Sequence, residues 1–133
     1  MKRLIILLTI LVSTTSSAQD YISPFDFPLY LSGTFGELRD HHFHTGIDVK
    51  TNAQEGKNLR VIADGYISRI KVSTWGYGKV LYIVHPYTGH TSVYAHMQKF
   101  NKEIEKVIKE QQYKKESFEI NYYPKKNSLL VQQ

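Results

Sequence analysis

Short β-rich segments separated by glycine turns fill most of this chain between residues 29 and 97, and this pattern limits the fold more than any other feature. Runs such as 66–72 and 80–85 carry many β-branched and aromatic side chains, which favour strands. Glycines stand where the chain has to reverse, at 64–65 (Asp-Gly) and at 76–78 (Gly-Tyr-Gly). Because about six short strands would follow one another with tight turns between them, we predict a mainly β fold built on an antiparallel sheet.

The pattern also places the individual strands and one turn. Strands are expected at residues 31–35, 47–50, 59–63, 66–72, 80–85, 91–97, 118–123 and 128–131. The runs 59–63 and 66–72 should form a hairpin around Asp64 and Gly65, because Asp-Gly is a strong signal for a two-residue turn. Residues 20–28 hold two of the four prolines and several aromatic rings, so they should form an extended arm that packs by those rings.

One segment has helical rather than β periodicity. Ile104 and Ile108 lie four residues apart, at the spacing of one helix face, and Glu105 and Lys109 form an opposite-charge pair at the same spacing. We therefore predict an amphipathic helix inserted at about residues 98–115. It should lie on the sheet, and we assign no chemistry to it.

The first residues have the features of a leader. A short basic start is followed by an apolar run at 4–12 and by small, polar residues at 13–18, which is the pattern of a secretory signal peptide over residues 1–18. An apolar run of about nine residues is far shorter than the roughly 20 that a spanning helix needs. We expect cleavage after Ala18 and export to the periplasm or beyond, with no stable membrane span left in the domain at 19–133.

Composition narrows the functional class. The chain has no cysteine, which excludes disulfides and a lipid-anchored lipoprotein. Its formal charge of +5 suits an ordinary solvated surface and weakly favours anionic polymers such as those of a cell wall. Nucleic-acid binding is not expected, because no glycine-rich, aromatic strand motif accompanies the charge.

The segment His44-Thr45-Gly46-Ile47-Asp48 carries the candidate chemistry. In a regular strand, residues four apart point to one face but stand about 13 Å apart, at about 3.3 Å per residue. Zinc ligands lie about 2.0–2.2 Å from the ion, so His44 and Asp48 can share one only if the backbone bends between them. Gly46 is the residue expected to supply that bend.

A third residue, His96, ends the expected strand 91–97 and could lie beside the pair. A hydrolytic zinc site uses three protein ligands and keeps one position open, with an acid or base nearby. His44 and Asp48 would be two of those ligands, and His96 would handle protons or stabilise the transition state. The other histidines are expected at the surface and Tyr94 in the core: His41 and His42 in a loop, and His85 and His90 beside a turn.

Five short motifs in one order resemble the lysostaphin and LytM type of zinc metallopeptidases, which cut peptide bonds in peptidoglycan crosslinks. They are Gly-Thr-Phe-Gly at 33–36, His-Thr-Gly-Ile-Asp at 44–48, Ala-Asp-Gly at 63–65, Gly-Tyr-Gly at 76–78 and Tyr-Ala-His at 94–96. The resemblance implies a lysostaphin-like β-sheet groove with a duplicated hybrid motif. It also implies that His44 and Asp48 are the first two zinc ligands and that His96 is the histidine near the zinc-bound water.

The chain departs from that family after His96. The family closes its site with a glycine-rich turn and a His-x-His pair that provides the third zinc ligand, and no histidine follows His96 here. The resemblance therefore implies an incomplete domain that lacks its C-terminal core strands and is inactive by itself, rather than an evolved variant.

Two other interpretations of the sequence stay open. One is a non-catalytic relative that keeps the groove and binds the cell wall or regulates another hydrolase. The other is a disrupted sequence without a stable product. Survival of His44, Asp48 and His96 favours the enzyme, because loss of function commonly removes ligands one at a time.

Overall fold

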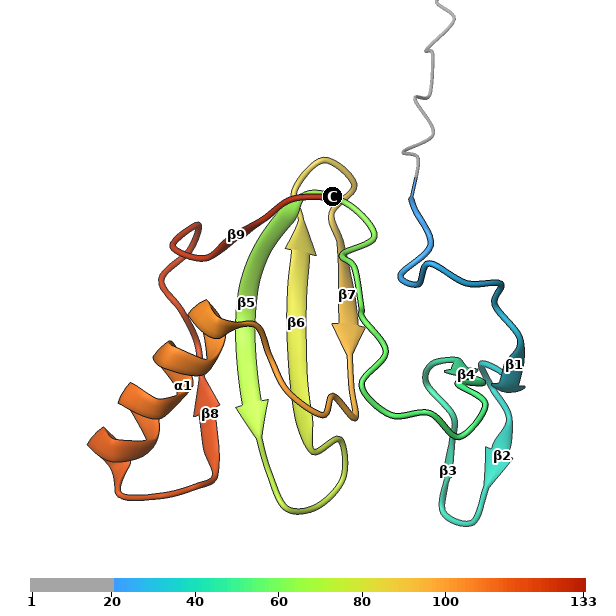
Figure 1. Ribbon diagram of the computed structural model, residues 1–133, viewed down its shortest axis with the longest axis horizontal. Coiled ribbons are helices and arrows are strands. Elements are labelled where there is room, and N and C mark those ends of the chain that lie inside the picture. Colours follow the sequence, from blue (N-terminus) through green and yellow to red (C-terminus); the bar gives the residue numbers. More distant parts are fainter. Residues whose placement is uncertain (1–20) are drawn as a thin grey trace, which may run out of the picture.

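A computed structural model describes residues 21–133 of the protein, and these residues form a mainly β structure with one helix (Figure 1). The predicted signal peptide at 1–18 lies outside the described residues. In chain order the elements are β1 (Leu31–Gly33), β2 (Leu38–Arg39), β3 (His42–Phe43), β4 (Asp48–Val49), β5 (Gly65–Val72), β6 (Lys79–His85), β7 (His90–Tyr94), α1 (Lys102–Lys115), β8 (Ile120–Tyr122) and β9 (Leu130–Val131).

The largest unit is a five-stranded antiparallel sheet. Its order is β7-β6-β5-β8, and β9 pairs with the part of β5 that β8 leaves free. Turns connect β5 to β6 and β6 to β7, and the first of them lies at the Gly-Tyr-Gly segment where a reversal was predicted. In the β5–β6 turn, Gly76 and Gly78 have φ angles of 71° and 60°, in the left-handed region that favours glycine. The predicted mainly β, antiparallel fold with one inserted helix is confirmed.

The first four strands form two small sheets beside this unit. β1 pairs with β4, and β2 pairs with β3 as a short hairpin, both antiparallel. Figure 1 shows them to one side of the five-stranded sheet, connected to it by the long segment that precedes β5. Within the described residues, no strand of β1–β4 packs against a strand of β5–β9.

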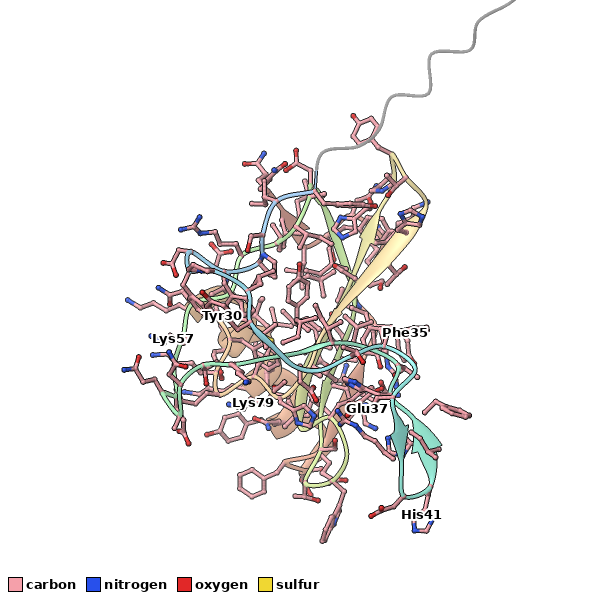
Figure 2. All side chains as sticks on the ribbon, turned by 90° about the vertical axis from the view of Figure 1, so that its right-hand side faces the viewer. Tyr30, Phe35, Glu37, His41, Lys57 and Lys79 are labelled. Carbon is pink, nitrogen blue, oxygen red and sulfur yellow. The ribbon has the colours of Figure 1, made fainter. Side chains whose placement is uncertain are left out.

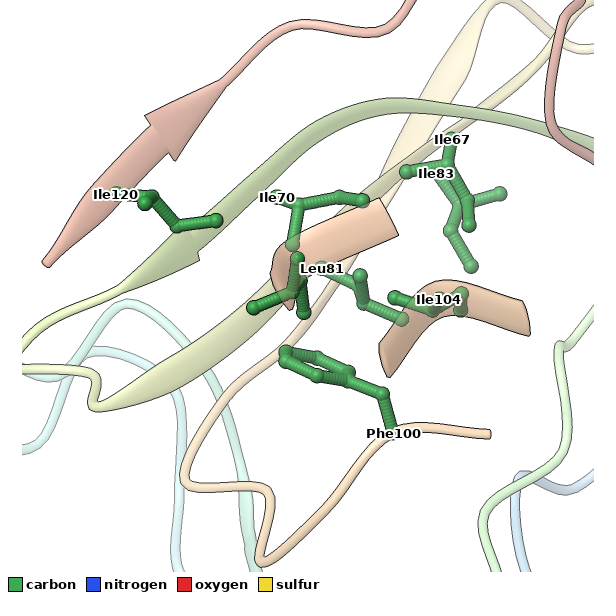
Figure 3. Close-up of a cluster of buried hydrophobic side chains, with 8 residues drawn as sticks. Ile67, Ile70, Leu81, Ile83, Phe100, Ile104 and Ile120 are labelled. Carbon is green, nitrogen blue, oxygen red and sulfur yellow. The ribbon is translucent and has the colours of Figure 1, made fainter. Parts of the chain in front are cut away.

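The apolar core lies between the five-stranded sheet and α1 (Figure 3). Its buried members come from β5, β6, β8, the helix and the residue Phe100 before it: Ile67, Ile70, Leu81, Ile83, Phe100, Ile104, Ile108 and Ile120. The helix therefore covers one face of the sheet with the stripe that its periodicity predicted.

The helix begins at Lys102, four residues later than predicted. Asn101 has extended backbone angles, and its side chain accepts a hydrogen bond from the Ile104 amide, so it caps the first turn. Phe100 lies before this cap and packs in the core without belonging to the helix. At the other end, Glu116 adopts a left-handed conformation with φ of 50°, which ends the helix.

The predicted hairpin at Asp64 and Gly65 is wrong. Residues 59–63 form no strand, and Gly65 is the first residue of β5 rather than part of a turn. A Cβ atom at Gly65 would stand 2.3 Å from the Val84 carbonyl oxygen, so this glycine allows close approach of two strands. Residues 60 and 62 instead form backbone hydrogen bonds with residues 24 and 22 of the N-terminal arm.

In the part of the chain that the structure describes, we find no helix with the length and apolar character needed to span a membrane.

Candidate metal centre

The backbone brings His44 and Asp48 together. His44 directly follows β3, Asp48 opens β4, and their side chains meet with Nε2 and Oδ1 3.4 Å apart. This distance is far below the roughly 13 Å of a regular strand, so the expected bend is present. The bend falls at Gly46, but its φ lies outside the left-handed region and a Cβ there would come no closer than 3.8 Å to any other atom. The bend therefore does not require a glycine, contrary to our expectation.

The position of His44 follows from the hairpin that precedes it. The Gly36 amide donates to the His44 carbonyl oxygen, and the His44 amide donates to the Glu37 carbonyl oxygen, both at 2.8 Å. The His44 ring is held as well, since its Nδ1 donates to the Thr34 carbonyl oxygen at 3.0 Å. This bond leaves Nε2 as the ring nitrogen that faces Asp48. The His44 side chain is largely buried, with 13% exposed.

The Asp48 carboxylate divides its two oxygens between two partners. Oδ1 faces His44, and Oδ2 accepts a hydrogen bond from Nη2 of Arg39, at the end of β2. The hydrogen bond and the positive charge of Arg39 lower the pKa of Asp48 below its ordinary value against the opposite effect of partial burial, and His44 and His96 lower it further when they are protonated. Asp48 is therefore an anion at neutral pH, which is the form that binds a metal.

His96 lies near this pair without bonding to it. When protonated it lowers the pKa of Asp48, yet within the described residues no hydrogen bond joins it to His44 or Asp48. Its amide donates to the Tyr77 carbonyl oxygen at 3.0 Å, and its ring meets the Tyr77 ring edge-on, with centroids 6.1 Å apart. His96 is exposed and has a φ of 55°, a left-handed conformation that costs a non-glycine residue about 1–2 kcal/mol.

The distance between the two side chains fits two ligands of one zinc ion. Two ligands at about 2.0–2.2 Å from one tetrahedral ion lie about 3.3–3.6 Å apart, and the distance between Nε2 and Oδ1 is 3.4 Å. The bond from Nδ1 to a carbonyl oxygen is the usual support of a metal-binding histidine. However, no group of three or more His, Cys, Asp or Glu side chains able to hold a metal occurs within residues 21–133. The described residues therefore offer two candidate ligands at this position and no third.

The remaining histidines divide between surface and core. His41 lies at the tip of the β2–β3 hairpin, away from Glu37 at its base (Figure 2), and is exposed as expected. His42 is exposed too, but it belongs to β3 rather than to a loop. His90 is exposed, and its Nδ1 lies 2.6 Å from the Tyr21 hydroxyl.

Our expectation of a surface position for His85 is wrong, because its side chain is fully buried. Its Nδ1 donates to the Asp64 carbonyl oxygen at 3.0 Å, and its Nε2 lies 2.8 Å from the Ser92 hydroxyl. Both ring nitrogens are thus satisfied, as a buried imidazole requires. The alternation of β6 could have revealed this, since Leu81 and Ile83 point to the same buried face. Tyr94 packs against the core, as expected.

Three residues of this region were not identified from the sequence as parts of the site. Arg39 holds Asp48, Thr34 orients His44 through its carbonyl oxygen, and the Tyr77 hydroxyl lies 3.1 Å from the Thr45 hydroxyl. Tyr77 stood in one of the family motifs but without a role. No sequence spacing indicates the Arg39 contact, because it depends on how two separate strand pairs come together.

Comparison with known proteins identifies a family by its sequence. The sequence pattern of Peptidase family M23 matches residues 42–113, more than half of the chain, and the match includes His44, Asp48 and His96. No curated protein and no solved structure gives a significant match to the chain.

Proposed function

Because this chain belongs to peptidase family M23, we propose that its His44–Asp48 pair is part of the zinc centre of an exported metalloendopeptidase. Peptidases of this family act on peptidoglycan and are generally zinc-dependent. The proposed substrates are accordingly the peptide crosslinks of peptidoglycan. The observation that carries the proposal is the 3.4 Å separation of His44 Nε2 and Asp48 Oδ1. The other polar atom of each side chain is already hydrogen-bonded, His44 Nδ1 to the Thr34 carbonyl oxygen and Asp48 Oδ2 to Arg39.

Each residue of the region has a role in this proposal. His44 and Asp48 hold the ion, which when bound would polarise the scissile carbonyl and a water molecule. His96, exposed and near Asp48, donates a hydrogen bond to the oxyanion or moves a proton. Tyr77 orients His96 through ring contact and backbone bonding.

Two ligands are fewer than the three that a hydrolytic zinc site uses. We therefore expect this chain by itself to bind zinc weakly and to release no peptide fragments from peptidoglycan. Export is part of the proposal, and the leader-like pattern at residues 1–18 supports it.

Zinc titration of the chain by calorimetry tests the assignment. His44→Ala and Asp48→Ala should each abolish the weak one-to-one binding, because each removes half of the ligand set. His41→Ala is the matched control, since His41 is exposed at the hairpin tip, and it should bind as the unchanged chain does. Equal loss in all three variants would contradict the assignment. Tight binding together with hydrolysis of purified peptidoglycan, followed by mass spectrometry, would contradict the two-ligand conclusion.

A non-catalytic role in cell-wall binding is the second candidate, and the two-ligand set within the described residues favours it. The hairpin that carries His44 also exposes Phe35, Leu38 and Phe43, with 75%, 76% and 64% of each residue accessible. Such rings and aliphatic side chains could contact wall peptides without a metal. Retention of the chain on purified peptidoglycan separates the two candidates. A pure binder is retained equally with and without a chelator, whereas a metal-dependent site loses retention when zinc is removed.

A further inference from the structure

Arg39 forms a hydrogen bond with the candidate ligand Asp48, and it lies outside the residues that match the family. Its Nη2 donates to Asp48 Oδ2, and the same nitrogen lies 3.4 Å from Glu37 Oε2. The guanidinium thus contacts two carboxylates, that of Glu37 just before β2 and that of Asp48 in β4.

Gly33 provides the space for this contact. A β-bulge in the pairing of β1 with β4 places Gly33 opposite Asp48, and Gly33 is buried. A Cβ atom there would stand 2.6 Å from Asp48 Oδ2, 2.7 Å from Arg39 Nη2 and 3.0 Å from Glu37 Oε2. The φ of Gly33 lies outside the left-handed region, so the position needs a glycine for space and not for backbone conformation.

The contact orients Asp48 without occupying the atom that faces His44. Arg39 binds Oδ2, whereas Oδ1 stays 3.4 Å from His44 Nε2. A carboxylate that is free at both oxygens rotates about its terminal torsion, which is broad. A guanidinium stays charged and has fixed donor directions, so it holds one oxygen and thereby sets the direction of the other.

Stability is not the main effect of this ion pair. The side chains of Arg39 and Asp48 are 37% and 43% exposed, and exposed ion pairs contribute little to folding. The contact between Arg39 and Asp48 therefore contributes little to folding, and its main effect is on the orientation of Asp48 in the candidate site.

We propose that Arg39 is a positioning residue that fixes Asp48 with Oδ1 directed at the shared position next to His44 Nε2, and that Gly33 makes this arrangement possible. This role rests on the proposed function of His44 and Asp48 as zinc ligands. Residues that hydrogen-bond a metal ligand without contacting the metal typically lower metal affinity about 10- to 100-fold when they are removed.

The experiment compares Arg39→Gln, Arg39→Lys and Gly33→Ala in the full chain. Zinc affinity by calorimetry should fall about 10- to 100-fold in Arg39→Gln and in Gly33→Ala, and by less in Arg39→Lys, which keeps the charge without the planar fork. Arg60→Gln is the matched control, because Arg60 forms an exposed ion pair with Asp26 elsewhere in the chain, and its affinity should not change. The thermal midpoint of metal-free Arg39→Gln should move by less than about 5 °C.

A crystal structure of metal-free Arg39→Gln gives a readout that does not depend on zinc. We expect Asp48 to turn, so that Oδ1 and His44 Nε2 separate beyond the 3.4 Å of the unchanged chain. An unchanged distance overturns the proposal, and so does an unchanged zinc affinity in Arg39→Gln when His44→Ala abolishes binding. Binding that survives in His44→Ala instead contradicts the metal assignment, so the two proposals fail in different ways.

Discussion

The segment that bears the candidate site and the sheet that comes after it are held together by different forces. Between residues 21 and 62, Gly33 is the one buried position among those described, whereas the apolar core lies between residues 63 and 120. The first region is maintained by polar contacts, such as those of Asp48 with Arg39 and of Thr45 with Tyr77. The second is maintained by aliphatic side chains packed between β5, β6, β8 and α1.

This difference indicates that one region stabilises the fold and the other carries the candidate site. Burial of apolar area gives most of the folding free energy, so the sheet and helix carry stability. Exposed hydrogen bonds and ion pairs each give little, so the site segment depends on the sheet for its position. Tyr77 in the β5–β6 turn connects the two, since it contacts Thr45 and also His96.

The largest expected effect comes from the core. Ile70→Ala should lower the free energy of unfolding by about 2–5 kcal/mol, because Ile70 is fully buried and its removal leaves a cavity. Leu38→Ala is the matched control in the site segment, where the side chain is 76% exposed, and should change stability by no more than about 0.5 kcal/mol. Denaturant unfolding measures both. Similar losses in the two variants would remove the distinction between the regions.

A smaller effect is expected at the connection between the regions. Tyr77→Phe removes the hydroxyl that meets Thr45 at 3.1 Å and should cost about 0.5–1.5 kcal/mol. Hydrogen exchange should quicken in residues 44–49 more than at the amides of β5, because the site segment loses its contact with the turn. Tyr87→Phe is the control, since Tyr87 is 89% exposed. Uniform acceleration across both regions would show that they unfold as one unit.

The smallest effect concerns pH. Glu119 Oε1 accepts hydrogen bonds from the Thr74 hydroxyl at 2.6 Å and the Thr74 amide at 2.8 Å, and these lower the pKa of Glu119. A carboxyl whose pKa is lowered by folding stabilises the protein above its ordinary titration range. That contribution is lost as the pH falls through the lowered value.

Glu119→Gln should therefore flatten the dependence of stability on pH on the acid side, measured by urea unfolding at pH 7 and at about pH 3. Glu110→Gln, on the exposed surface of α1, is the matched control and should leave the slope unchanged. An unaltered slope in Glu119→Gln would mean that the contact with Thr74 does not tie β8 to the β5–β6 turn.

Much of the fold was predictable because it follows from local patterns. Runs of β-branched and aromatic residues located β5 and β6, glycines located the turn at 76–78, and the spacing of Ile104 and Ile108 located the helix. The predicted start of the helix was less accurate, because the apolar spacing continues back to Phe100 while the Asn101 cap makes the helix begin only after it. The hairpin at Asp64 and Gly65 was wrong because the same dipeptide serves a turn in one context and close strand approach in another.

The candidate site was predictable only in part. Residue type and motif order singled out His44, Asp48 and His96 as candidates, since the chemistry of zinc hydrolysis restricts the residue types that can serve it, and their role as ligands stays a prediction. Only the tertiary structure decided that His44 and Asp48 meet at 3.4 Å, that Arg39 holds Asp48, and that Gly33 makes room for both. The physical reason is that a local pattern determines which face of a strand a side chain occupies. Which side chains meet depends on the register and bulges of strands that pair across the chain.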